Sequence, residues 1–181
     1  MSFNSQTNFG KNMKQKQQLA KELFYQNSNY HFERREKKTL VLKWVAPSDK
    51  KTINETLYEP LKIDKLCDIY IDTFTTWHST TVPANNIEDS AFVLKINEFN
   101  LQISSNDATI FNSIVIPNDF TGAASASNKK THKGKKLNYI CSINPTNIDK
   151  ITGTITDLNG DANMFTAGDL FIAEFIFVAR D

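Results

Sequence analysis

Residues 170–178 read LFIAEFIFV, and this run decides the fold class of the 181-residue chain. Glu174 is the only charged residue in the run, so both faces of an extended strand here would be apolar. Strands that are apolar on both faces lie inside a sheet, covered on both sides. The run is also far shorter than the roughly 20 apolar residues that span a bilayer. We therefore predict a central β-strand.

Seven further strands are predicted before this run, because apolar residues alternate with polar ones and Pro, Asn, Asp or Gly separate the segments. Pro60 favours an edge strand or a bulge for the second of them. A shift in the apolar phase near Asn97 predicts a bulge in the fourth. The seven predicted strands cover residues 39–45, 57–63, 67–77, 92–103, 110–116, 137–143 and 151–155.

Eight short strands without a convincing helix in the body predict an all-β sandwich or barrel. A lipocalin-like barrel is the alternative on strand count, but its strands are joined mostly by short hairpins. The long segment Thr121–Gly134 is more typical of a Greek-key crossover. We therefore expect a single eight-stranded jelly roll, which is a two-sheet β-sandwich, with an N-terminal arm.

Charge divides the chain into two predicted parts. Residues 1–38 hold eight Lys/Arg and three Glu, whereas residues 39–181 hold 13 Lys/Arg and 17 Asp/Glu. We expect residues 1–38 to be a basic arm that is extended or ordered on assembly, and residues 39–181 to be the jelly-roll domain. The arm residues expected to contact acidic neighbours are Lys11, Lys14, Lys16, Lys21, Arg34 and Arg35.

No motif in the sequence supports catalysis. His31, His78 and His132 are expected to be solvated, since none stands in a metal-ligand spacing with another ligand residue. The sequence contains no glycine-rich phosphate loop, nucleophile elbow or HExxH motif. We expect a protein that is not an enzyme and that has no cofactor, metal or small-molecule substrate.

Two loops have two interpretations each. Asp157–Asp161 resembles the opening of a calcium loop, but Gly168 occupies the position of the bidentate Glu, so a tight turn is favoured. Asn128–Lys136 holds five lysines and could bind an anion such as nucleic acid. A solvated loop is favoured there, because no aromatic residues for base stacking are interleaved.

Cysteine and aromatic usage gives two more expectations. Cys67 and Cys141 lie in apolar runs and are expected to be buried free thiols of a protein made in the cytosol. Aromatic residues exceed what one small core needs, so some are expected in subunit contacts. These aromatics are Trp44, Tyr70, Phe74, Trp77 and those of the last strand.

Three segments carry a resemblance to a known family: residues 137–140 (LNYI), 151–160 (ITGTITDLNG) and 171–177 (FIAEFIF). In them the chain resembles the single jelly-roll capsid proteins, penton and minor capsid proteins, of large or giant double-stranded DNA viruses of protists and algae. The resemblance covers residues 39–181 in strand order, and it is sharpest over roughly the last 45 residues.

The resemblance implies a virion protein made in the host cytoplasm, with five copies forming a homopentamer at a capsid vertex. It implies that the arm binds major or minor capsid proteins, an internal membrane or packaged DNA. A minor capsid role away from the vertex is an alternative, because no spike domain is evident. A lectin-like or tumour-necrosis-factor-like ligand-binding sandwich and a cupin-like enzyme are the rivals from other classes.

Overall fold

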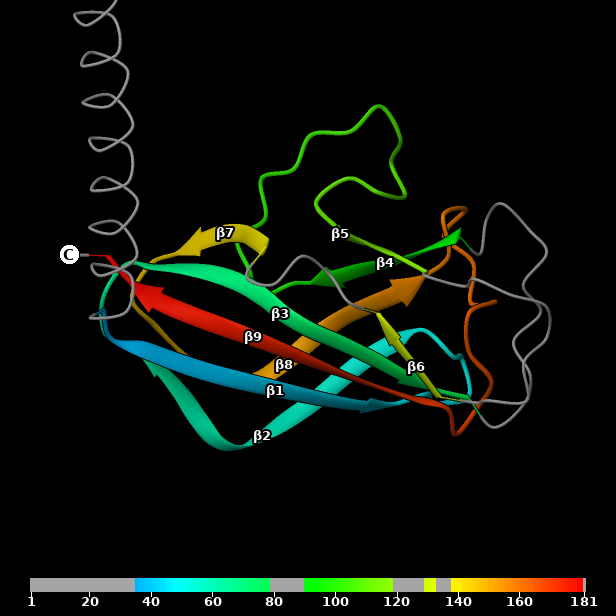
Figure 1. Cartoon of the computed structure of the whole chain (residues 1–181), viewed down its shortest axis with the longest axis horizontal. Coiled ribbons are helices and arrows are strands. Elements are labelled where there is room, and N and C mark those ends of the chain that lie inside the picture. Colours follow the sequence, from blue (N-terminus) through cyan, green and yellow to red (C-terminus); the bar gives the residue numbers. More distant parts are fainter. Residues whose placement is uncertain (1–34, 79–89, 119–128, 133–137, 181) are drawn as a thin grey trace, which may run out of the picture. The chain divides into compact units, whose positions relative to one another are not determined.

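The apolar run near the C-terminus forms strand β9 (Leu170–Ala179), which lies between β1 (Lys37–Val45) and β3 (Cys67–Trp77) in the computed structural model (Figure 1). The prediction of a central strand is confirmed. Residues of β9 alternate between full burial and partial exposure up to Phe177, and Val178 and Ala179 are both buried.

The structure describes residues 35–78, 90–118, 129–132 and 138–180. Lys37–Arg180 form one compact unit, and no α-helix occurs among the described residues. The remaining strands are β2 (Thr52–Ile63), β4 (Ala91–Ile96), β5 (Ile114–Pro117), β6 (Lys129–His132), β7 (Asn138–Ile143) and β8 (Thr146–Thr156).

The strands form two antiparallel sheets with the connectivity of a jelly roll. One sheet has the order β1-β9-β3 and continues to β6 and β7, and the other has the order β2-β8-β4-β5. Pairing is nested along the chain: β1 with β9, β2 with β8, β3 with β6 and β7, and β4 with β5. The predicted all-β jelly-roll sandwich is therefore confirmed.

Nine strands occupy eight places in the two sheets. Both β6 and β7 pair with β3, β6 along Phe74–Trp77 and β7 along Cys67–Ile71. They act as the two halves of one edge strand. The sequence predicted only the second half, because Lys129–His132 were interpreted as part of a solvated lysine-rich loop. That interpretation is wrong for these four residues, whose pairing with β3 places them in a strand although lysine is depleted in strands.

The core fills the space between the sheets with aliphatic and aromatic side chains. Trp44 is fully buried, stacks on Phe171 at a centroid distance of 5.1 Å and meets Phe165 edge to face at 5.1 Å. Its indole Nε1 donates to the Thr52 carbonyl over 2.8 Å, which satisfies the one polar atom of the ring. Truncating such a residue to alanine removes about 3–5 kcal/mol of stability.

Strand β3 contains a bulge that the sequence did not reveal. Its register against β9 shifts between Ile71 and Thr73, so Thr73 is exposed and Phe74 enters the core with 1% exposure. Simple alternation predicted Phe74 on the opposite face from Ile71. One extra residue in a strand reverses the facing of every residue after it.

The middle of the chain is less regular than predicted. β4 ends at Ile96, and Phe99 and Leu101 are buried in a turn and a loop rather than in a bulged continuation of the strand. The fifth strand begins at Ile114 and not near Ile110. Here buried apolar residues recur at a strand-like spacing although they do not pair with a sheet. Periodicity alone cannot distinguish this arrangement from a strand.

Strand β2 confirms the prediction made from Pro60. β2 is the first strand of its sheet, with β8 on one side, and its register shifts between Thr56 and Leu61. Figure 1 shows the resulting sharp bend in β2.

Candidate assembly surface

The outer face of the β1-β9-β3 sheet carries apolar side chains over a core that is already complete. Val45, Leu170 and Trp77 lie in one cross-strand row, because Leu170 pairs with both of the others. Val41 and Ile172, 59% and 37% exposed, lie on the same face of the sheet. We call these five residues the sheet-face patch.

The sheet-face patch lies outside the core that packs between the two sheets. The side chains that alternate with it, such as Leu42, Phe171 and Ala173, already fill the interior. Full burial of one exposed Val or Ile is worth about 1.5–3 kcal/mol. Lys43 lies opposite Ile172, and Glu174 lies opposite Val41, so charges of both signs are interspersed with the apolar side chains of the patch.

A polar cluster lies beside the edge strand β7. Arg180 Nη2 lies 2.6 Å from Asp68 Oδ1 and donates to Ser142 Oγ over 2.7 Å, and Ser142 Oγ lies 3.0 Å from the Tyr139 hydroxyl. The hydrogen bonds from Arg180 to Asp68 raise the pKa of that guanidinium above its usual value. Tyr139 packs edge to face on Tyr70 at 5.8 Å. Tyr and Arg are the side chains that most often dominate interface energies.

The aromatic residues expected in part in subunit contacts divide between the core and the outer face, and their role in contacts stays a prediction. Trp44 and Phe74 belong to the core, whereas Tyr70 and Trp77 are half-buried on the outer face. Alternation along β3 could not separate Phe74 from Tyr70, because the bulge between them reverses which face of the strand is buried.

His78 is buried, which corrects the expectation that it is solvated. Its Nδ1 lies 3.3 Å from Asp169 Oδ2, its Nε2 lies 3.0 Å from Thr76 Oγ1, and its ring stacks on Phe165 at 5.2 Å. The order hydroxyl, imidazole, carboxylate matches a hydrolytic triad. Thr76 is 0% exposed, however, so a substrate carbonyl has no access to its hydroxyl. The cluster joins the end of β3 to the segment before β9 as a buried polar contact.

The loop Asp157–Asp161 is a tight turn, as the favoured interpretation predicted. Asp157 Oδ1 accepts from the backbone N–H groups of Asn159 and Asp161, and Oδ2 accepts from Asn163. Gly160 has a φ of 85°, which a glycine adopts without strain. The carboxylate of Asp157 thus takes protein donors in place of an ion.

The predicted arm contacts remain predictions. Lys11, Lys14, Lys16, Lys21 and Arg34 lie outside the described residues, as does His31. Arg35 is described and half-buried, but it precedes the sandwich. His132 belongs to β6 rather than to a loop.

Both cysteines are buried free thiols, as expected. Burial raises the pKa of the Cys141 thiol to about 11, and the charge of Asp68 acts in the same direction. Cys141 therefore stays protonated and unreactive at neutral pH.

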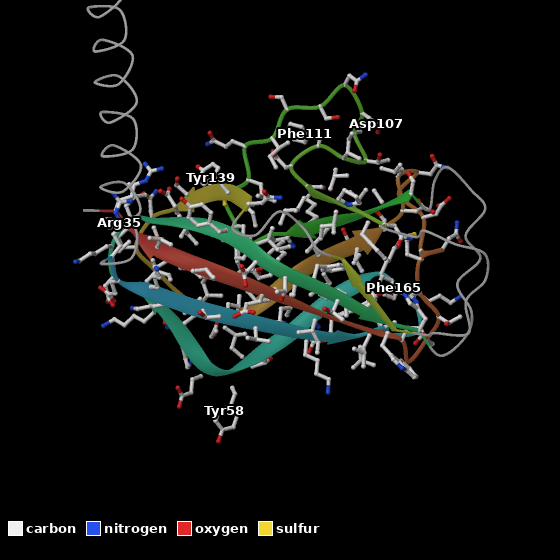
Figure 2. All side chains as sticks on the ribbon, in the orientation of Figure 1. Arg35, Tyr58, Asp107, Phe111, Tyr139 and Phe165 are labelled. Carbon is white, nitrogen blue, oxygen red and sulfur yellow. The ribbon has the colours of Figure 1, made fainter. Side chains whose placement is uncertain are left out.

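Three exposed aromatic or apolar residues were missed in the sequence. Tyr58 lies at the bend of β2 and Phe111 in the loop between β4 and β5 (Figure 2). Val115 lies within β5. Tyr58 had a usable signal, because it lies two residues before the Pro60 that predicted a bulge. No sequence signal marked Phe111 as exposed, because the pattern does not show which way a loop side chain points.

Comparisons with known proteins found only weak similarity. No protein-family model and no curated protein matches the chain. A similar solved structure is the infectious bursal disease virus VP2 subviral particle, with 13% identity and a TM-score of 0.28. The match covers 79% of this chain and 33% of VP2, so the chain spans about a third of that protein. At this similarity the match is no argument about function.

Among the described residues, no group of three or more His, Cys, Asp or Glu could hold a metal ion. Within the same residues, no helix combines the length and apolarity needed to cross a membrane.

Proposed function

We propose that this chain is a structural protein of a viral capsid, without catalytic activity, and that it forms the pentameric penton subunit at the vertices of an icosahedral double-stranded DNA virus. The virion is then its site of action. The observation that carries the proposal is the sheet-face patch, because it leaves apolar area exposed on the open surface of a complete sandwich.

The position of the patch favours a protein partner over a small ligand. Small-molecule sites are concave and enclose most of the ligand, whereas this patch spreads over three strands of a sheet. Exposed apolar side chains that cluster with charged neighbours mark protein contacts. Lectins and cupins share the jelly roll, so the fold alone does not select between these classes.

A ring of five requires a heterologous contact, in which the patch of one copy meets a different surface of the next. The basic residues 1–38 would add a second contact, with Lys11, Lys14, Lys16, Lys21, Arg34 and Arg35 meeting acidic surfaces of neighbouring capsid proteins. Packaged DNA or an internal membrane would offer the basic arm the same negative charge.

The first experiment is the absolute mass of the purified chain by light scattering, over a range of protein and salt concentrations. A discrete assembly of five 20.6 kDa chains is the expected result. A trimer would replace the penton proposal with a trimeric capsomer or a ligand-binding sandwich. A monomer at all concentrations would overturn self-driven assembly and favour a minor capsid protein that needs its neighbours.

A pair of matched variants tests the patch. Val41 on β1 and Val115 on β5 are both mid-strand valines, 59% and 46% exposed, on opposite sheets. Val41→Lys is expected to weaken assembly at least tenfold, because it places a charge in the contact, while Val115→Lys leaves it unchanged. Assembly that survives Val41→Lys would remove the patch from the contact.

A further inference from the structure

Two carboxylates lie beside the apolar side chains of the sheet-face patch. Glu174 lies opposite Val41 of β1 on one side and opposite Thr73 of β3 on the other. Asp72 directly precedes Thr73, at the point where the register of β3 against β9 shifts. Its Oδ1 atom is buried and has no hydrogen-bond partner among the described residues. A buried carboxylate oxygen without a donor is unfavourable, so this position favours a cation supplied by a partner.

The charges around the patch leave a surplus of negative charge. Lys43 lies two residues beyond Val41 on β1 and supplies one positive charge. It cannot balance both Asp72 and Glu174. An apolar surface with surplus negative charge is complementary to a partner that presents apolar and basic side chains together.

Residues 11–25 of the same sequence, KNMKQKQQLAKELFY, carry both kinds of side chain. They contain four lysines and one acidic residue, Glu22, so the segment is basic. Its larger apolar side chains gather at its end, at Leu19, Leu23, Phe24 and Tyr25. Lys21 lies within this apolar group, so a surface that binds the group also meets a positive charge.

The segment can reach a neighbouring copy. Tyr25 lies 12 residues before Lys37, where β1 begins, and Leu19 lies 18 residues before it. These lengths correspond to at most about 40 and 60 Å of extended chain. A compact unit of the length of Lys37–Arg180 has a radius of gyration of about 15 Å and is therefore roughly 40 Å across.

The direction of β1 favours the patch of a neighbour over the patch of the same chain. The chain enters the sheet at Lys37, whereas Val41 and Val45 lie about 13 and 27 Å further along β1. A copy's own arm would have to turn back over the sheet to cover them. Ordering the connecting residues in such a reversal costs conformational entropy, and the arm of a neighbour needs no reversal.

We propose that residues 11–25 of one copy bind the sheet-face patch of the neighbouring copy. Lys21 then lies beside Asp72 and Glu174, and the apolar residues of the segment cover Val41 and Ile172. This inference rests on the proposed capsid function and deepens it, because it makes the arm the surface that the patch meets in the ring.

Fluorescence anisotropy of a labelled synthetic peptide with residues 11–25 tests the contact itself. The full chain is used below the concentration at which it assembles, so that no other copy occupies the patch. Saturable binding is expected, and Glu174→Lys should weaken it at least tenfold, because like charges then meet. Glu59→Lys is the matched control, since Glu59 is exposed on β2 in the other sheet. No saturable binding, or equal loss in both variants, would overturn the proposal.

Charge reversal distinguishes the arm of a neighbour from the chain's own arm. Lys21→Glu and Glu174→Lys are each expected to weaken assembly at least tenfold in light scattering. An equimolar mixture of the two variants should assemble again, because every contact between unlike chains then joins opposite charges. A ring of five keeps at least one contact between like chains, so this rescue is expected to be partial. Rescue only when both changes are in one chain would indicate an intramolecular contact and overturn the proposal.

Failure of this inference can be distinguished from failure of the proposed function. A pentamer that is unaffected by Lys21→Glu and by Glu174→Lys would preserve the ring and overturn the arm contact. A chain that stays monomeric but binds the peptide with the expected dependence on Glu174 would support the contact and overturn the self-assembled ring.

Discussion

The imidazole Nδ1 of His78 lies 3.3 Å from the carboxylate of Asp169, with side chains that are only 4% and 2% exposed. Asp169 also accepts from the backbone N–H and the hydroxyl of Thr166, over 2.8 and 2.7 Å. One carboxylate thus links the end of β3 to the turn that leads into β9.

Replacing Asp169 is expected to destabilise the fold strongly. Asp169→Ala leaves two Thr166 donors and the His78 ring without their buried acceptor, which costs about 3 kcal/mol. Urea denaturation measures the loss. Asp149→Ala, at an exposed position of β8, should change the free energy of unfolding by less than about 0.5 kcal/mol. Similar losses in both variants would contradict a special role for Asp169.

Gly153 is expected to tolerate no side chain. A Cβ built at this position would lie 1.9 Å from the Lys95 carbonyl oxygen, and backbone in the middle of a sheet cannot move aside cheaply. We expect Gly153→Ala to cost at least about 3 kcal/mol in thermal or urea unfolding.

Gly168 provides the control for backbone conformation. It has a φ of 90°, but a Cβ there would meet no atom within 4 Å. Gly168→Ala should cost only the conformational strain, about 1–2 kcal/mol. A smaller loss at Gly153 than at Gly168 would contradict the close approach of β8 to β4.

Cys141 is expected to make the fold sensitive to alkali. Its folded pKa of about 11 lies above the unfolded value of 9.0, so the unfolded chain loses its proton first. The free energy of unfolding should therefore fall as the pH rises from about 9 to 11. Cys141→Ala should remove this part of the fall, which the difference between the two pH profiles isolates. At pH 8, Cys141 should react with thiol reagents only at the rate of unfolding.

The Arg180–Asp68 pair is expected to respond to salt. Arg180 lies at the surface, so ions screen its attraction to Asp68, and the Debye length falls from about 10 Å at 0.1 M to about 3 Å at 1 M. The destabilisation caused by Arg180→Ala should therefore shrink as sodium chloride rises. Lys62→Ala provides a more exposed comparison, through its pair with Asp64. A salt-independent loss at Arg180 would show that packing on β7 dominates.

The sequence by itself determined the fold class and most strand positions. Alternation of apolar residues located β1, β3, β7 and β9 closely, because burial between two sheets demands it whatever the partner strands are. Pro60 located the irregularity in β2, because proline lacks the N–H that a regular ladder needs. The turn at Asp157 could also be predicted from the sequence, because its hydrogen bonds join residues that are close together in the chain.

Only the tertiary structure decided the features that depend on segments far apart in the chain. The bulge before Phe74 arises from pairing with β9, about 100 residues later, and β6 becomes a strand only because β3 offers it an edge. His78 is buried because Asp169 lies beside it, a contact between residues 91 positions apart. The sheet-face patch and the exposed Tyr58 follow the same rule: local sequence sets which side chains can alternate, but only packing decides which face of a strand the core leaves uncovered.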